Sequence, residues 1–220
     1  MEENVKAIIF DLDGVLVYTD QFHYQAWKRL ADRLGIYFDE TINNRLRGVS
    51  RMESLNIVLE RAERPFSPEE KEAFAAEKNE QYRKLLASMT PEDVSPAVRA
   101  ALTKLKRRGY RLAIGSSSKN TKFILERVGL TGFFDAVSDG TNISRSKPDP
   151  EVFLKAAEYL GEEPGQCAVI EDAFAGIDAA KAAAMWAVGI GDAAKYERAD
   201  ARIQTFSELL NLFPERRTEG

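Results

Sequence analysis

Two aspartates stand two residues apart in the stretch AIIFDLDGVLV, residues 7–17, directly after an apolar run. Burial and the repulsion between like charges both oppose ionisation of Asp11 and Asp13 together, so the arrangement is costly unless a cation or a chemical task compensates. A carboxylate can act as a nucleophile, and a second carboxyl can give or take the proton that a reaction moves. The pair therefore indicates a cation site, covalent catalysis, or both.

A second pair of acids, Glu171 and Asp172, follows another apolar run, CAVI. If both runs are strands of one parallel sheet, the acids lie at the same edge, where such strands end. Carboxylates without imidazole or thiolate neighbours suit a hard cation, and Mg²⁺ in particular is commonly held by one or two of them. We therefore expect a Mg²⁺ site formed by Asp11, Asp13, Glu171 and Asp172. Taken alone, Asp172 also fits a helix cap or a turn.

Three serines and a lysine are further candidates for the site. Ser116, with Ser117 and Ser118, comes after a strand-like run and precedes a helical one. A hydroxyl and the free N–H groups of a helix start can bind phosphate oxygens, although such a serine is also a common helix cap. Lys147 lies in a loop with two prolines, so it is either a cation held in place or a solvated loop lysine.

The composition is that of an ordinary soluble globular protein. The 220 residues are 44% apolar, enough for one large domain or two smaller ones. A net charge of −4 offers no basic face for nucleic acid or anionic lipid. The single cysteine, Cys167, is expected to be a small buried apolar residue in a reducing compartment. Without a signal-peptide pattern or a membrane-length apolar run, we expect a cytoplasmic protein.

Strand-like runs alternate with helical patterns over most of the chain. The runs cover residues 5–10, 111–115, 167–170 and 186–190, with a weaker one at 133–139. Such alternation indicates a parallel sheet with active residues at the carboxyl ends of its strands. We expect an α/β fold, with a Rossmann-like parallel sheet as the core and helices on both faces.

Residues 18–88 interrupt this alternation. Four segments of this stretch have helical periodicity and start at Asp, Ser or Ser-Pro, and no strand-like run lies between them. Four helices are too many for a single crossover between two strands. We therefore expect an inserted four-helix cap domain over 18–88 and an α/β catalytic core domain formed by 1–17 and 89–220.

Four ordered segments resemble the signature motifs of the haloacid dehalogenase superfamily of phosphotransferases. They are DLDGV, Ser116 after the second strand, SKPDP with Lys147, and IEDAFAGIDAA with Glu171 and Asp172. Their spacing covers nearly the whole chain, and the insert resembles the all-helical cap of one class of this superfamily. Shorter stretches, HYQAW, RGVSR, EKN and SSSKN, are similar to those of its sugar-phosphate mutases.

The resemblance implies a role for each core residue. Asp11 would be the nucleophile that carries an aspartyl phosphate. Asp13 would be the general acid and base, and its backbone carbonyl would also ligate Mg²⁺. The remaining roles fall to the phosphate-binding residues Ser116, Ser117 and Lys147, to the metal ligand Asp172, and to Glu171 as a ligand or a hydrogen-bond partner of one.

The resemblance also implies that the cap binds the part of the substrate that does not react. Arg51 would hold a distal phosphate through its forked guanidinium, whereas by itself it fits a solvated first-turn position. His23 would couple cap closure to Asp13, or else pack in the core beside Trp27. Tyr18 departs from the family pattern, which often has an acid there, and this puts the hinge geometry in doubt. The expected substrate-binding residues are His23, Trp27, Gly48, Val49, Ser50, Arg51, Lys78 and Asn120, of which Lys78 also fits a solvated helix face.

The reaction implied is the interconversion of β-D-glucose 1-phosphate and glucose 6-phosphate, through an aspartyl-phosphate enzyme and β-glucose 1,6-bisphosphate. The alternative is a sugar-phosphate phosphatase, which shares every core residue and passes the phosphoryl group to water. A remote alternative is a receiver-like phosphoacceptor signalling protein, which would carry its aspartate on a middle strand and have no helical insert. The expected partner is a small sugar phosphate, with no nucleic acid and no membrane, and a monomer is expected because the cap must swing freely.

Overall fold

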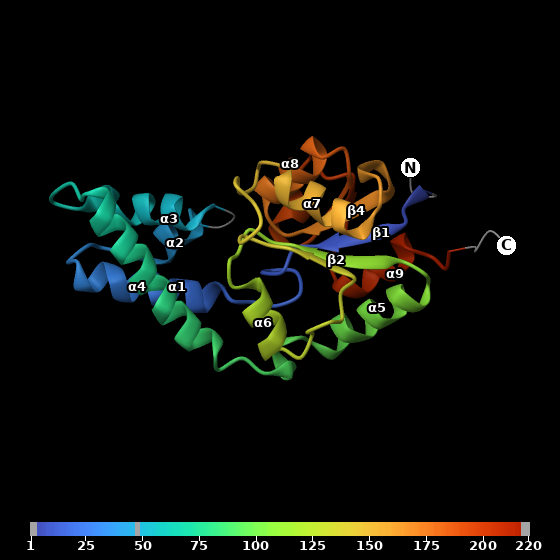
Figure 1. The fold of residues 1–220 in the computed structure, drawn as a ribbon, viewed down its shortest axis with the longest axis horizontal. Helices are drawn as coiled ribbons and strands as arrows, with labels where there is room; N and C mark the ends of the chain where they lie inside the picture. The colour runs from blue at the N-terminus through green and yellow to red at the C-terminus, as the bar shows by residue number, and fades with distance from the viewer. Residues whose placement is uncertain (1–3, 47–48, 217–220) are drawn as a thin grey trace. The chain divides into compact units, whose positions relative to one another are not determined.

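The computed structural model describes residues 4–46 and 49–216. They form two compact units (Figure 1), of which one runs up to Tyr18 and resumes at Thr90, and the other is Thr19–Met89. We call the first the core unit and the second the cap unit. The boundaries expected from the sequence, after residues 17 and 88, lie next to these.

The core unit is built on a six-stranded parallel sheet in the order β3-β2-β1-β4-β5-β6. Its strands are β1 (Ala7–Phe10), β2 (Arg111–Gly115), β3 (Ala136–Ser138), β4 (Cys167–Glu171), β5 (Trp186–Gly189) and β6 (Ala201–Arg202). β1 lies between β2 and β4, and the register sets Phe10 beside both Ile114 and Ile170. The acids that follow β1 therefore stand in the middle of the sheet edge. This confirms the expected α/β fold.

Helices cover both faces of this sheet (Figure 1). α7 (Glu151–Leu160) and α8 (Phe174–Ala182) lie on one face, and α5 (Pro96–Arg107), α6 (Thr121–Arg127) and α9 (Leu209–Leu212) on the other. Ile9 of β1 packs into the first layer with Phe153 and Ile177. Phe10, which points the other way, stacks on Phe206 with ring centroids 5.8 Å apart. Because β1 is buried on both faces, its sequence is a continuous apolar run.

Local signals in the sequence set the helix that leads into β2. Ser95 is the N-cap of α5 and accepts a hydrogen bond from Val98 N at 3.3 Å, and Pro96 occupies the first helical turn. Gly109 ends the segment with a φ of 84°, a left-handed conformation that glycine adopts without strain. The chain thereby turns sharply enough to enter β2 two residues later.

The cap unit consists of helices. They are α1 (Asp20–Arg33), α2 (Glu40–Asn44), α3 (Arg51–Val58) and α4 (Pro68–Leu86), with a short 3-10 turn, Leu59–Arg61, after α3. α4 begins at a capping box in which Ser67 and Glu70 each bind the other's backbone N–H. In the hydrophobic core of the cap unit, Trp27 and Leu30 of α1 pack with Leu55 of α3. The expected four-helix insert is confirmed in the part of the cap that the structure describes. Across both units, no described helix combines the length and the apolar character needed to cross a membrane.

Candidate active site

The carboxyl ends of β1 and β4 bring three acids together. One carboxylate oxygen from each of Asp11, Glu171 and Asp172 lies within 4.8 Å of the other two. The backbone fixes this meeting, because Asp11 N donates to Ile170 O at 3.0 Å and so extends the β1–β4 ladder into the site. Two segments far apart in the sequence thus present their acids to one place, as the strand ends predict.

Two glycines leave room for these carboxylates. A Cβ on Gly14 would lie 2.1 Å from Asp172 Oδ2, and a Cβ on Gly176 would lie 2.0 Å from Glu171 Oε1. Both distances are far shorter than any stable contact, so a larger residue at either position would displace an acid. Gly14 also has a φ of 82°, which the tight turn after β1 requires. The glycines of the first and last motifs therefore serve the acid cluster directly.

Lys147 supplies the positive charge at the centre of the cluster. Its Nζ lies 2.5 Å from Asp11 Oδ1 and 2.5 Å from Glu171 Oε1, and it sits over the ring of Phe153 at 4.7 Å. The residue is only 6% exposed. Lys147 is therefore a buried cation held between two acids, and the alternative of a solvated loop lysine is wrong.

The charge balance of the cluster favours a further cation. Burial raises the pKa of Asp11 well above its usual range, against the opposing effect of Lys147. Burial, and then the charge of Glu171, raise the pKa of Asp172 to about 7. For Lys147, burial lowers the pKa, but the two neighbouring carboxylates outweigh it and the pKa rises above its ordinary value. Three acids face one lysine, and all the donor atoms are carboxylate oxygens, so the residues fit a hard divalent cation such as Mg²⁺.

Asp13 takes a different place from the other acids. It is half-buried in the turn after β1, where Gly14 N donates to Val17 O at 2.7 Å. Its carboxyl lies outside the group of three, yet its charge contributes to the raised pKa of Asp172. The side chain is thus beside the acid cluster, in a less buried environment than Asp11. Its expected ligation of Mg²⁺ through the backbone carbonyl stays a prediction.

The serines after β2 lie in a loop, residues 116–120, that is held by hydrogen bonds within the loop and by one hydrogen bond to the segment that carries Lys147. Ser116 Oγ accepts from Ser118 N at 3.3 Å, and Ser118 Oγ accepts from Asn120 N at 3.2 Å. Ser117 Oγ accepts from Lys147 N at 3.4 Å. Asn120, expected among the substrate-binding residues, is buried in the core unit just before α6. Ser116 and Ser118 thus each accept from the backbone N–H two residues ahead and shape the turns before α6, whose N-cap, Asn120, makes no side-chain cap hydrogen bond. Ser117 joins this loop to the segment that carries Lys147.

Arg51 opens α3 in the cap unit. Ser50 is the N-cap of this helix, with Oγ accepting from Glu53 N at 3.3 Å. Arg51 is half-buried and donates to Asn79 Oδ1 at 2.8 Å, so it is not a fully solvated first-turn residue. Burial lowers its pKa from the usual value, but the group stays charged at any physiological pH. Of its expected neighbours, Val49 is half-buried, and Gly48 lies outside the described residues.

A second cation in the cap, Lys78, is also buried. It is 3% exposed, its Nζ lies 2.9 Å from His23 Nδ1, and it sits over the rings of Trp27 and Tyr82 at 4.7 and 4.5 Å. Burial, and then the charges of Lys78 and Arg51, hold the pKa of His23 well below its usual range. With Nδ1 accepting from Lys78, the neutral ring carries its proton on Nε2. The alternative of a solvated lysine on the helix face is therefore wrong, and the expected contact of Lys78 with the substrate stays a prediction.

Sequence reasoning missed two polar residues of this cluster, Asn79 and Tyr82. Tyr82 donates to Thr19 Oγ1 at 2.9 Å, and its ring lies 4.0 Å from that of His23. A signal was available, because Lys78 and Tyr82 are four residues apart and so share one face of α4.

Known proteins are similar to this chain in sequence and in fold. A model of the haloacid dehalogenase-like hydrolase family matches residues 5–184. The chain belongs to this family. A β-phosphoglucomutase from Bacillus subtilis is 42% identical over 207 residues, which cover 93% of this chain and 92% of the relative. The fructose-1-phosphate phosphatase YqaB from Escherichia coli is 34% identical and covers 86% of this chain and 98% of its own.

A comparison with solved structures also finds a similar protein. The crystal structure of a β-phosphoglucomutase from Clostridium difficile matches with a TM-score of 0.87 and 39% identity, and 93% of each chain is covered. These matches confirm the resemblance to the haloacid dehalogenase superfamily. The protein is an enzyme of this superfamily, and the named relatives divide between sugar-phosphate mutases and phosphatases.

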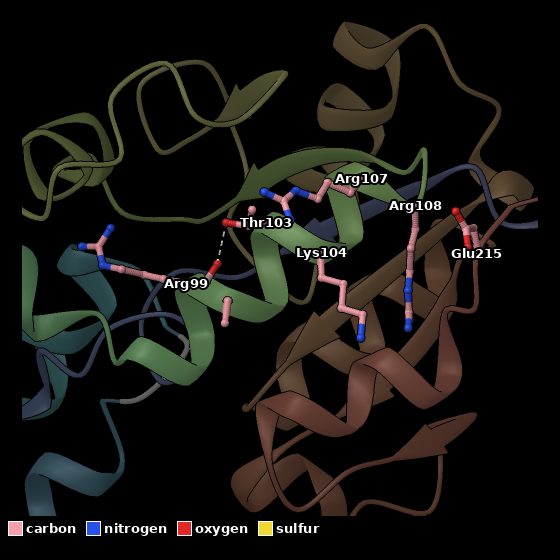
Figure 2. Close-up of a pocket in the computed structure, with 7 residues that line it drawn as sticks. Arg99, Thr103, Lys104, Arg107, Arg108 and Glu215 are labelled. Carbon is pink, nitrogen blue, oxygen red and sulfur yellow. Dashed lines mark hydrogen bonds between the residues drawn. The ribbon is translucent and has the colours of Figure 1, made fainter.

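A separate groove of about 780 Å³ runs along α5 in the core unit (Figure 2). Its lining residues are Arg99, Ala100, Thr103, Lys104, Arg107, Arg108 and Glu215. Arg99 and Arg108 each donate to two main-chain carbonyls of neighbouring segments. These two arginines therefore tie the core unit together, and the groove shares no residue with the carboxylate cluster.

Proposed function

We propose that this protein is a Mg²⁺-dependent β-phosphoglucomutase that interconverts β-D-glucose 1-phosphate and glucose 6-phosphate. The observation that carries the proposal is the buried ion-pair cluster, in which Lys147 holds Asp11 and Glu171 at 2.5 Å each. It presents a carboxylate oxygen beside a fixed positive charge, which is what attack on an anionic phosphoryl group needs. The similarity to β-phosphoglucomutases from two organisms supports the choice of sugar.

In the proposed reaction, Asp11 and Asp13 divide the work. An Asp11 oxygen forms a bond to phosphorus while the bond from phosphorus to the sugar oxygen breaks, and Asp13 gives that oxygen a proton. In the return step, Asp13 takes the proton from the other sugar hydroxyl, which accepts the phosphoryl group from Asp11. The burial of Asp11 and the half-exposed position of Asp13 support different protonation states for the two carboxyls.

The surrounding residues would stabilise the phosphoryl group. Lys147 and the hydroxyls of Ser116 and Ser117 would lie against its oxygens. Asp11, Asp172 and Glu171 would hold Mg²⁺, with Asp13 contributing its backbone carbonyl. The bound ion supplies positive charge against the transferring group.

The cap would bind the second phosphate of the bisphosphate intermediate. Arg51 fits this role, because it donates to the neutral amide of Asn79 and keeps its own charge. His23, Trp27, Val49, Ser50 and Lys78, with Asn120 of the core unit, complete the proposed substrate-binding set, to which Gly48 also belongs. We propose that the enzyme acts as a cytoplasmic monomer on small sugar phosphates, without nucleic acid or membrane.

A sugar-phosphate phosphatase is the second candidate, favoured by the similarity to the phosphatase from Escherichia coli. The two candidates differ in whether a sugar hydroxyl or water takes the phosphoryl group from Asp11. The deciding experiment incubates the protein with β-glucose 1-phosphate, Mg²⁺ and a trace of β-glucose 1,6-bisphosphate, and follows phosphorus by NMR. The mutase predicts glucose 6-phosphate. Inorganic phosphate and glucose in its place would contradict the mutase, and Asp11→Asn is the inactive control.

A further inference from the structure

We propose that the turn at residues 139–142 is a positioning element for the phosphate-binding loop at 116–120, and that Gly140 is its point of contact. The inference rests on the proposed phosphoryl transfer at Asp11. None of the four turn residues belongs to the acid cluster, so they would act only through the loop that they hold.

The turn is fixed by its own side chains. Asp139 Oδ1 accepts from Thr141 N at 2.8 Å and from Thr141 Oγ1 at 2.5 Å. Asn142 Oδ1 accepts from Asp139 N at 2.6 Å, and Asn142 Nδ2 donates to Tyr159 OH at 3.0 Å. Each side chain thus restrains a backbone group of the same turn, and α7 restrains the turn through Tyr159.

Gly140 connects the restrained turn to the phosphate-binding loop through backbone contacts. Gly140 N donates to Ser118 O at 3.1 Å, next to the point where Ser116 N donates to Ser138 O at 3.1 Å. A Cβ on Gly140 would lie 2.3 Å from Ser117 O and 2.9 Å from Lys119 N. The turn and the loop therefore touch backbone to backbone, and a single added carbon would force them apart.

The segment that follows the turn, residues 143–147, ends at Lys147, the lysine of the proposed active site. Glu151 Oε2 holds this segment by accepting from Ser144 N at 2.9 Å and from Arg145 N at 2.8 Å. Lys147 N then donates to Ser117 Oγ at 3.4 Å. The segment 139–147 thus contacts the phosphate-binding loop both at Gly140 and at Lys147. Displacement of Gly140 would therefore move the serines of the loop relative to Lys147.

The burial of the turn supports a positioning role. Asp139 is 1% exposed. Its Oδ2 accepts no hydrogen bond from the part of the chain that the structure describes. Burying a carboxylate oxygen without a protein partner is unfavourable. An aspartate at this place therefore costs more than an apolar residue would, which fits a side chain whose task is to shape the turn.

The test compares Gly140→Ala with Gly165→Ala. Gly165 lies in the same unit and has open space where its Cβ would be, so it controls for adding a methyl group to a glycine. Folding is checked by thermal unfolding, and kcat, KM and the calorimetric Kd for inorganic phosphate with Mg²⁺ are then measured. We expect Gly140→Ala to lower kcat about 10-fold to 100-fold, because small displacements of catalytic groups have effects of that size. Phosphate binding should weaken, while KM for the sugar phosphate, to which the cap contributes, should change less.

A second pair of variants covers the case in which Gly140→Ala does not fold. Asp139→Ala removes the oxygen that fixes the turn, whereas Asp139→Asn keeps one. We expect Asp139→Ala to lose kcat and phosphate affinity and Asp139→Asn to restore both, a rescue that general destabilisation would not give. If folded Gly140→Ala, or the alanine variant at 139, matches the unaltered protein in both quantities, the inference is overturned. Failure of the proposed function would instead appear in the unaltered protein, as an absence of turnover.

Discussion

Replacing Lys147 by methionine should leave an uncompensated group of acids at the centre of the core unit. The change keeps most of the side-chain length and removes the charge that lies 2.5 Å from both Asp11 and Glu171. Because the group is buried, water cannot take over the role of the ammonium. Both the stability of the protein and the reactivity of Asp11 should respond.

The ion-pair distances set the size of the effect. At an effective dielectric constant of about 20, Coulomb's law gives about 332/(20 × 2.5), or about 7 kcal/mol, for each of the two pairs before desolvation is counted. Desolvation of all three groups cancels most of this, and removing one partner of a buried pair typically costs about 3–5 kcal/mol. We expect the lower end, about 3 kcal/mol, because the carboxyls can take up protons to relieve their repulsion.

Proton uptake gives this prediction a sign in pH. Without Lys147, the pKa of Asp11 rises further above that of the unfolded chain, since burial already raises it and Lys147 is the group that lowers it. The folded variant then binds more protons than the unfolded chain around neutral pH. Its stability deficit should therefore shrink as the pH falls from about 7.5 to about 5.5.

Urea unfolding of metal-free protein at these two pH values measures the effect. The matched control is Lys155→Met, because the contact of Lys155 with Glu151 is 4.0 Å long and Lys155 is 34% exposed. A partly exposed pair with a contact this long contributes less than about 1 kcal/mol. Equal stability of the Lys147 and Lys155 variants at both pH values would show that Lys147 does not compensate the buried acids. At neutral pH, Lys147→Met should also lose about a hundredfold or more in kcat.

Three further changes test separate parts of the site. Asp13→Asn should leave the Kd for a sugar phosphate within a few-fold and lower kcat by about 10²–10⁴, because it removes only the proton transfer; calorimetry and steady-state rates check this, and unchanged turnover would refute the role. Arg51→Ala should raise KM for the bisphosphate by about tenfold or more and weaken inorganic phosphate binding little, since a hydrogen bond to a charged group contributes about 1.5–3 kcal/mol; a parallel loss of both would contradict a distal site. The pKa of His23 is held well below the ordinary 6.5, so below that pH the unfolded chain binds a proton that the folded chain excludes. The unaltered protein should therefore lose up to about 1.4 kcal/mol per pH unit more than His23→Asn in urea unfolding between about pH 6.5 and 5.5, and identical slopes would contradict it.

The sequence was informative about the acid cluster because parallel strands end together. Asp11, Glu171 and Asp172 follow apolar runs that could be identified as strands, and their meeting needs only the register of β1 and β4. The fold class followed from the same alternation of runs and helical patterns. β6 was not predicted, because the two residues Ala201 and Arg202 are too few to show a periodicity.

Charged residues within helices were harder to interpret. α4 carries charges on many sides, and periodicity alone did not show that Lys78 is buried against Trp27 and His23. The position of Gly140 was also hidden, because its importance depends on a backbone contact with Ser118 that no local pattern encodes. Contacts between distant loops depend on tertiary packing, which sequence patterns describe least well.

In the proposed reaction, Asp11 carries the phosphoryl group, and this step can be observed directly. An aspartyl phosphate is an acyl phosphate, which borohydride reduces to homoserine, so protein incubated with Mg²⁺ and β-glucose 1,6-bisphosphate can be trapped, digested and analysed by mass spectrometry. We expect homoserine at position 11, in the peptide that contains DLDGV, and none when the bisphosphate is omitted. Homoserine at another aspartate, or an unmodified residue 11 in protein that turns over, would contradict it.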